Sequence, residues 1–311
     1  MSMPTMPAAG CTWRAAGIKA PPGTVSVYNL DTLELVGEIP NVSAHGAAVS
    51  SKSNHGFASS KPVAMWDTKT MAMIKTIDVD GGPDGILHDA FNDRVYTFSH
   101  RAPNATVINA VDGTVAGTID LGGAPEQAAS DGQGKLYVDI EDKDNIAVVD
   151  AKTMTVTAHY DLAGKGGTCA GLAMDVKNQI LFATCRNPQT MVILNAGDGK
   201  IVTTLPIGQG TDGAVFNPST MEAFSSHGDG TLTIVKENSP ASFAVEQTVQ
   251  TIARRQDIDV GPEDQPRPAD RRGVRRASHA SQGGSKGRTW GPRADGAGFV
   301  FDPDGRQVSR H

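Results

Sequence analysis

The chain has few cysteines, few aromatic residues and no long apolar run. Its 311 residues include three cysteines, too few for a disulfide scaffold and without the CxxC spacing of many zinc sites. No stretch reaches the roughly 18 to 20 apolar residues that a membrane helix needs, so we expect no membrane span. The start, MSMPTMPAAGCTWRAAGIK, lacks the apolar centre of a secretory signal.

Positive charge is also scarce. The 28 Lys and Arg are outnumbered by 34 Asp and Glu, so we expect no nucleic-acid partner for the body of the chain. There is no GxSxG motif of a serine hydrolase, and Gly-rich segments such as GKGGTCAG enter strands rather than helices, unlike phosphate-binding loops. By contrast, 35 glycines and 18 prolines mark many turns, which favours an all-β protein.

A four-strand unit of about 40 residues recurs along the chain. In each unit an apolar strand ends at an anchor residue, followed by a turn, a second strand, a Gly-rich loop, a small-residue strand and an aromatic-centred strand. The anchors are Asn29, Asp67, Asn109, Asp150, Asn195 and, as a sixth, Lys236. Asn and Asp suit this position because their side chains hydrogen-bond to the backbone two residues on and begin a turn. The pattern predicts a β-propeller of four-stranded blades.

The segment KLYVDIEDKDNIAVVDAKTMTV resembles the YVTN-type repeat family, and the resemblance covers residues 24–253. Asp139 departs from it, because the motif usually has Thr there. The resemblance implies a seven-bladed propeller, here with incomplete first and last blades, and a periplasmic or secreted location. Such repeats specify a fold well and a function poorly.

Both ends of the chain depart from the repeat. Residues 1–23 show no counterpart of the two inner strands that should precede the first anchor. Residues 254–311 form an Arg/Gly-rich tail, in which positions 261–311 contain nine Arg, one Lys and neither Leu nor Ile. The tail is either a natural disordered basic segment or the product of a GC-rich gene read out of frame after TIARR. We favour the second explanation.

Polar residues gather where loops of successive units open on one end of the propeller. With strands named A to D from the axis outward, the loops entering A and joining B to C share this end. They contribute His45, Asp84, Glu126, Ala170 and Asp212 at the A entrance, and Lys61, His100, Glu141, Arg186 and His227 between B and C. Several like charges facing one channel repel each other unless a cation is present.

These residues predict a site for a divalent cation. We expect its ligands to be His45, Asp84, Glu126, Glu141 and Asp212, and the ion to be Ca²⁺ or a transition metal. His100, Arg186 and Lys61 would contact the substrate, and Asp212 with His227, or Glu126, would deprotonate the attacking water.

Two functions are compatible with such a site. The first is metal-assisted hydrolysis of a small lactone or ester, such as an acyl-homoserine or sugar lactone, in the axial funnel. The alternative is a non-enzymatic scaffold that binds a ligand, peptide, polymer or protein at the mouth. We expect a monomer in either case.

Two of the cysteines, Cys169 and Cys185, fall near each other on the A and B strands of one unit. They form either a disulfide in an oxidising compartment or two free thiols in a reducing one. Neither has a histidine in the aligned loops, which disfavours a cysteine nucleophile.

The frame hypothesis for the tail makes a prediction about the gene. One of the other two reading frames after the TIARR codons should encode an alternating apolar stretch that continues the repeat. Resequencing and translating that region tests this, and the absence of such a stretch from both frames would show that the basic tail is authentic.

Overall fold

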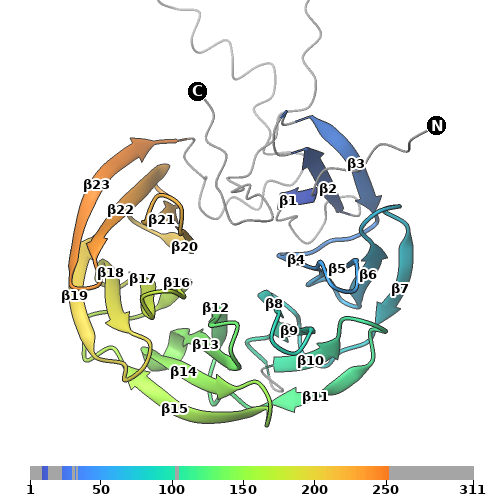
Figure 1. The fold of residues 1–311 in the computed structure, drawn as a ribbon, viewed down its shortest axis with the longest axis horizontal. Helices are drawn as coiled ribbons and strands as arrows, with labels where there is room; N and C mark the ends of the chain where they lie inside the picture. The colour runs from blue at the N-terminus through green and yellow to red at the C-terminus, as the bar shows by residue number, and fades with distance from the viewer. Residues whose placement is uncertain (1–8, 13–22, 30–31, 33, 102–104, 252–311) are drawn as a thin grey trace, which may run out of the picture.

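The computed structural model is a ring of antiparallel β-sheets (Figure 1). It describes residues 9–12, 23–29, 32, 34–101 and 105–251. These form one three-stranded and five four-stranded sheets, named blades 1 to 6 in chain order. The Arg/Gly-rich tail lies outside the described residues.

Within each four-stranded blade, the strands follow one another outward from the axis (Figure 1). Blade 2 contains β4 (Ala47–Ser50), β5 (His55–Ala58), β6 (Val63–Asp67) and β7 (Met73–Ile77). Blade 3 contains β8 (Ile86–Asp89), β9 (Arg94–Phe98), β10 (Ala105–Asn109) and β11 (Val115–Ile119). Blade 4 contains β12 (Pro125–Ser130), β13 (Lys135–Ile140), β14 (Asn145–Asp150) and β15 (Thr155–Asp161), with a 3₁₀ turn at Glu141–Lys143.

The last two blades complete the described ring. Blade 5 contains β16 (Cys169–Asp175), β17 (Ile180–Arg186), β18 (Gln189–Asn195) and β19 (Ile201–Pro206). Blade 6 contains β20 (Thr211–Asn217), β21 (Glu222–His227), β22 (Thr231–Ser239) and β23 (Ser242–Gln250). The predicted all-β architecture of four-stranded units is therefore confirmed. The arc between blades 6 and 1 holds no described strand (Figure 1).

Blade 1 corrects one expectation about the N-terminal segment. It contains β1 (Ala9–Thr12), β2 (Thr24–Asn29) and β3 (Leu35–Pro40), and β1 pairs with β2 as an inner strand. We had expected no inner strand from residues 1–23. A four-residue strand places only two residues on each face, which is too short to show the alternation that identifies strands in a sequence.

Four of the six anchor residues begin turns as the repeat predicts, whereas the side chain of Asn109 donates from Nδ2 to Thr114 Oγ1 at 2.7 Å. The side-chain oxygen of Asp150 accepts the backbone N–H groups of Lys152 and Thr153, at 2.9 and 2.7 Å. Asn29, Asp67 and Asn195 accept equivalent bonds from residues two or three positions on. Lys236 cannot accept a hydrogen bond, and the β22–β23 hairpin there continues to nine residues in each strand.

Neighbouring blades are joined by apolar packing and by a repeated hydrogen bond. Carbonyl oxygens of the alanines after three anchors each contact a side chain of the preceding blade. The pairs are His55 Nδ1 with Ala110 O, Asn92 Nδ2 with Ala151 O, and Tyr137 Oη with Ala196 O, at 2.8, 3.1 and 2.9 Å. Because a blade alone would expose both faces, burial between neighbours stabilises the ring.

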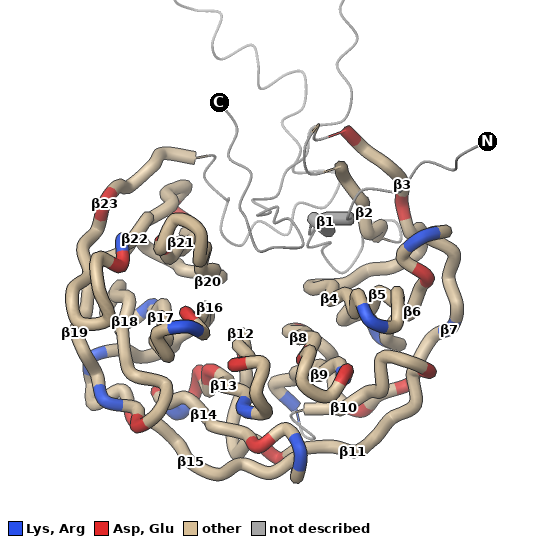
Figure 2. The backbone as a smooth tube through the Cα atoms, viewed as in Figure 1, with Lys and Arg blue, Asp and Glu red and all other residues tan. Residues whose placement is uncertain are grey.

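The interface of blades 5 and 6 is built around Phe182, which is fully buried. Its ring stacks on Phe216 with centroids 5.2 Å apart and meets Phe243 edge-on at 5.9 Å. Acidic and basic residues, by contrast, are spread over loops and outer strands around the ring (Figure 2). None of the described segments is a helix of the length and hydropathy that a membrane span requires.

Truncating Phe182 should therefore destabilise the propeller. We expect Phe182→Ala to lower the free energy of unfolding by about 3 to 5 kcal/mol, because it leaves a cavity and removes both ring contacts. Urea unfolding measures this. The matched control is Phe91→Ala, which removes a 47% exposed ring and should change stability by about 0.5 kcal/mol or less. Equal losses in the two variants would contradict the proposed role of this interface.

Candidate functional site

The inner strands of blades 4 to 6 each carry a bulge near their first residue. Pairing is irregular between Pro125 and Ala128, between Cys169 and Gly171, and between Thr211 and Gly213. The residues at these bulges are Glu126, Ala170 and Asp212, which the repeat analysis places at the A entrance. A bulge re-aims a side chain out of the regular pleat, and bulges are common next to binding sites.

Close contacts between imidazole and carboxyl groups connect the residues around this end of the ring. His45 Nδ1 lies 3.3 Å from Asp84 Oδ1, while His100 Nε2 lies 3.9 Å from Asp84 Oδ2 and 3.3 Å from Glu126 Oε1. The carboxyl group of Glu141 is close enough to raise the pKa of Glu126. We call the set His45, Asp84, His100, Glu126, Glu141, Arg186 and Asp212 the charged mouth.

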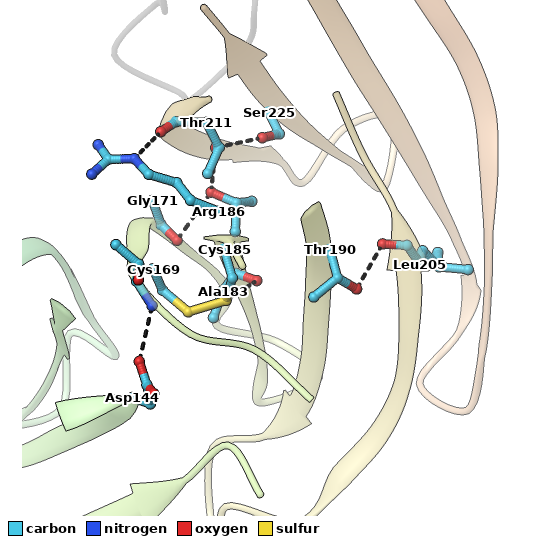
Figure 3. The surroundings of a disulfide bond; sticks show 12 residues. Asp144, Cys169, Gly171, Ala183, Cys185, Arg186, Thr190, Leu205, Thr211 and Ser225 are labelled. Carbon is cyan, nitrogen blue, oxygen red and sulfur yellow. Dashed lines mark hydrogen bonds between the residues drawn. A yellow bond between two sulfur atoms is a disulfide. The ribbon is translucent and has the colours of Figure 1, made fainter. Parts of the chain in front are cut away.

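Arg186 forms the other end of the charged mouth. Its Nη1 donates to Glu141 Oε1 at 2.6 Å, and its Nη2 lies 3.6 Å from Asp212 Oδ1. Its Nε donates to Thr211 O at 3.0 Å, so the side chain reaches from β17 to β20 (Figure 3). Interactions between titratable side chains therefore run from blade 2 to blade 6.

Three residues converge closely enough to hold a metal ion. One ligand atom from each of Asp84, His100 and Glu126 lies within 4.8 Å of the other two. Two of the three are among the predicted ligands, whereas His100 is predicted as a substrate contact. His45 lies against the other oxygen of Asp84, which is the place of an outer-sphere residue that orients a ligand.

The remaining predicted residues lie outside that group of three. Glu141 and Asp212 both contact Arg186. Lys61 donates a hydrogen bond to the carbonyl oxygen of Gly81, so it ties blade 2 to the loop before blade 3.

Burial and neighbouring charge perturb the carboxyl groups of the mouth. Burial, followed by the charges of Glu141 and Asp84, raises the pKa of Glu126 to about 8, and Arg186 opposes the shift. A carboxyl with such a pKa can hold or release a proton near neutral pH.

Asp139 adds a second carboxyl beneath Glu126. It is fully buried, and neither of its oxygens has a hydrogen-bond partner among the described residues. Burial and then the charge of Glu126 raise its pKa well above the ordinary value. The equivalent residue of blade 5 is Thr184, whose hydroxyl donates to Gly171 O at 3.3 Å. The sequence shows that Asp139 departs from the repeat, but it does not show this burial.

His227 does not lie where the sequence predicts. It pairs with Thr211, as Cys185 pairs with Cys169, so the residue equivalent to Arg186 is Gly228. A one-residue shift in register moves a side chain to the opposite face of a strand. His227 is accordingly buried, with Nδ1 3.1 Å from Thr231 O and Oγ1, and burial lowers its pKa.

Catalysis by the predicted pair of Asp212 and His227 stays a prediction. The Asp212 side chain is 52% exposed and lies beside Arg186, whereas His227 contacts Thr231 on the neighbouring strand. Glu126 is the one predicted catalytic residue that the structure brings to the converging group.

The two cysteines of blade 5 are joined by a disulfide (Figure 3). The sequence left open whether these cysteines form a disulfide or remain free thiols, and in the structure they form the disulfide. Cys185 directly precedes Arg186, so the cross-link fixes the end of β17 from which Arg186 extends across to Thr211.

Sequence reasoning missed Gln127, which follows Glu126 in β12. Its side-chain amide makes three hydrogen bonds to the backbones of β16 and β20. The residues after His45, Asp84, Ala170 and Asp212 are all glycine, so this position is the exception among five units. Aligning the units shows a glutamine among four glycines at this position, but it does not show the hydrogen bonds that the glutamine makes.

Comparison with known proteins defines the class of fold. No protein-family model and no curated protein sequence matches the chain. Among solved structures, it is similar to a functionally unknown protein from Desulfotomaculum acetoxidans, with a TM-score of 0.64 and 10% identity over 78% of this chain and 79% of that one.

Two further similar structures are a set of WD40 repeats and a chain of a multi-protein complex. The RRP9 WD40 repeats match with a TM-score of 0.63 and 9% identity, over 80% of this chain and 83% of that one. A chain in the mitotic checkpoint complex matches with a TM-score of 0.63 and 13% identity, over 75% and 73%. The protein is thus a β-propeller, and at these identities the likeness concerns the fold alone.

The raised pKa of Glu126 predicts a pH-dependent stability. The unfolded carboxyl releases its proton near pH 4.5 and the folded one near pH 8, so the folded state binds more protons between these values. Stability should therefore fall as the pH rises from about 4.5 to 8, and Asp139 should act in the same direction. Without metal, Glu126→Gln should be more stable than the parent at pH 8, by on the order of 2 kcal/mol.

Urea unfolding at several pH values in EDTA tests this expectation. The control is Glu246→Gln, which removes an exposed charge on β23 and should leave the pH dependence unchanged. A parent protein whose stability is flat or rises across this pH range would contradict the assignment.

Proposed function

We propose that the protein is a metal-assisted hydrolase that acts on a small lactone or ester at the charged mouth. The observation that carries the proposal is the convergence of Asp84, His100 and Glu126 from two neighbouring blades, with ligand atoms within 4.8 Å. This donor set favours a particular kind of ion. Ca²⁺ takes oxygen ligands only, whereas an imidazole with carboxylates suits Zn²⁺ or another divalent transition metal. We therefore infer a transition metal.

The residues divide the chemical roles among them. A bound ion would polarise the ester or lactone carbonyl and lower the pKa of a coordinated water. Asp84, His100 and Glu126 would hold it, and His45 would orient Asp84 through its second oxygen. Glu141 lies against Glu126 and would accept the proton of the attacking water, while Arg186 holds Glu141 in place.

The second candidate is a scaffold that binds a peptide, polymer or protein and catalyses no reaction. It is favoured by the spread of the charged mouth over blades 2 to 6, because a site shared by many loops suits a large partner. The cavity found between blades 2 and 3, lined in part by Asp80, Thr106 and Val115, does not include any residue of the mouth.

We also propose a cellular location and a repeat family for the protein. The disulfide of Cys169 and Cys185 supports a periplasmic or secreted location, because disulfides persist in oxidising compartments. The anchor turns support membership of the YVTN-type repeat family.

Metal binding and turnover together test the proposal. The parent protein should bind Zn²⁺ more tightly than Ca²⁺ in calorimetry and should hydrolyse members of a lactone and ester panel. EDTA should abolish this activity and Zn²⁺ should restore it. We expect Asp84→Asn to weaken Zn²⁺ binding more than tenfold and His45→Ala to weaken it roughly tenfold.

Controls separate the two candidates. Glu246→Gln, with an exposed charge on the outer strand β23, should behave as the parent does. Zn²⁺ binding without turnover of any panel member would leave the scaffold as the function. If neither Zn²⁺ nor Ca²⁺ binds, the metal site itself is wrong.

A further inference from the structure

Gln127 occupies an inner-strand position that is glycine in four other blades. The equivalent residues, each directly after the A-entrance residue, are Gly46, Gly85, Gly171 and Gly213. At Gly171, a Cβ atom would lie 2.7 Å from Ala214 N and 2.3 Å from Thr184 Oγ1. At Gly85, it would lie 2.7 Å from Glu126 O. Inner strands therefore approach so closely at Gly85 and Gly171 that these two positions exclude side chains, whereas at Gly213 the nearest atom would lie 3.8 Å away.

The Gln127 side chain instead connects three inner strands. Its Oε1 accepts the backbone N–H of Leu172 in β16 at 3.0 Å and that of Ala214 in β20 at 2.9 Å. Its Nε2 donates to Ala214 O at 2.9 Å. The amide of a blade 4 residue thus pairs with the backbone of blade 6 as well as with that of blade 5.

These contacts fix the bulges that carry the mouth residues. Glu126 precedes Gln127, and Leu172 and Ala214 each lie two residues after a bulge residue of their own blade, Ala170 or Asp212. On its other side, the Glu126 backbone oxygen packs against Gly85. The position of Glu126 relative to Asp212 is therefore set by Gln127, across two blade boundaries.

We infer that Gln127 is a positioning residue, whose amide holds the bulges of blades 4, 5 and 6 in register so that Glu126 meets Asp84 and His100. We call the three hydrogen bonds of the Gln127 side chain the latch. The latch holds the three inner strands together whether or not a metal binds. Its effect on metal binding at Asp84, His100 and Glu126 rests on the proposed function. An amide is required because one oxygen must accept two N–H groups while a donor faces Ala214 O.

Hydrogen exchange tests the latch directly. In Gln127→Ala, the backbone amides of Leu172 and Ala214 lose their acceptor, and their exchange measured by NMR should quicken roughly tenfold or more. In Gln127→Glu, one carboxyl oxygen can still accept both bonds, and the other can donate to Ala214 O when it is protonated, so at a pH below the pKa of that carboxyl both amides should remain protected. The matched control is Gln133→Ala, an exposed glutamine in the turn between β12 and β13, which should change neither amide.

Metal affinity tests the positioning role. We expect Gln127→Ala to weaken Zn²⁺ binding roughly tenfold, Gln127→Glu to restore most of it, and Gln133→Ala to have no effect. Unchanged exchange at Leu172 and Ala214 in Gln127→Ala would overturn the latch. Faster exchange with unchanged Zn²⁺ affinity would overturn the positioning role.

The two proposals fail separately. If the parent binds no metal but Gln127→Ala still loses protection at the two amides, the latch is confirmed and the hydrolase proposal is wrong. If Gln127→Ala does not fold, the protected amides of Gln127→Glu, compared with those of the parent, decide whether an acceptor at this position is what the backbone requires.

Discussion

The structure depends on the packing of neighbouring sheets, and among the described residues blades 2 to 5 each lie between two others (Figure 1). A single blade would leave both faces of its middle strands exposed, and the aliphatic and aromatic side chains that cover them come from the adjacent blades. Side-chain bonds to the carbonyls of Ala110, Ala151 and Ala196 set how one blade sits on the next. Because every blade obeys the same rule, loops of the same type arrive at the same end of the ring, and this arrangement creates the charged mouth.

In the charged mouth, the fold holds several carboxyl groups close together despite their mutual repulsion. Asp84, Glu126 and Glu141 come close together where solvent is partly excluded, which raises the pKa of Glu126. Arg186 partly compensates the charge from one side, and His100 lies between the other two carboxyl groups. Bound protons or a bound cation reduce the repulsion in such a group of carboxyl groups. The stability of the site therefore depends on the pH or on the concentration of that cation.

Exceptions to the repeat mark the residues that set the site apart. Asp139 replaces a hydroxyl residue, Gln127 replaces a glycine, and a disulfide joins Cys169 and Cys185 in one blade. All lie in blades 4 and 5, next to Glu126 and Arg186. In blade 5 the corresponding positions are Thr184, whose hydroxyl donates to the carbonyl oxygen of Gly171, and Gly171 itself, which has no room for a side chain.

The sequence by itself determined the propeller, because strand alternation and turn-forming anchors such as Asp150 are local properties that recur with a fixed period. It also determined that Asp84, Glu126 and Arg186 lie at one end, since equivalent loops of a repeat must converge. Only the tertiary structure decided which of them touch. The register of β20 and β21 places His227 opposite Thr211 rather than at the position equivalent to Arg186, and a one-residue shift of this kind leaves the alternating pattern almost unchanged. The burial of Asp139 and the reach of Gln127 across two blades depend on how closely the inner strands approach, a distance set by the packing of the whole ring.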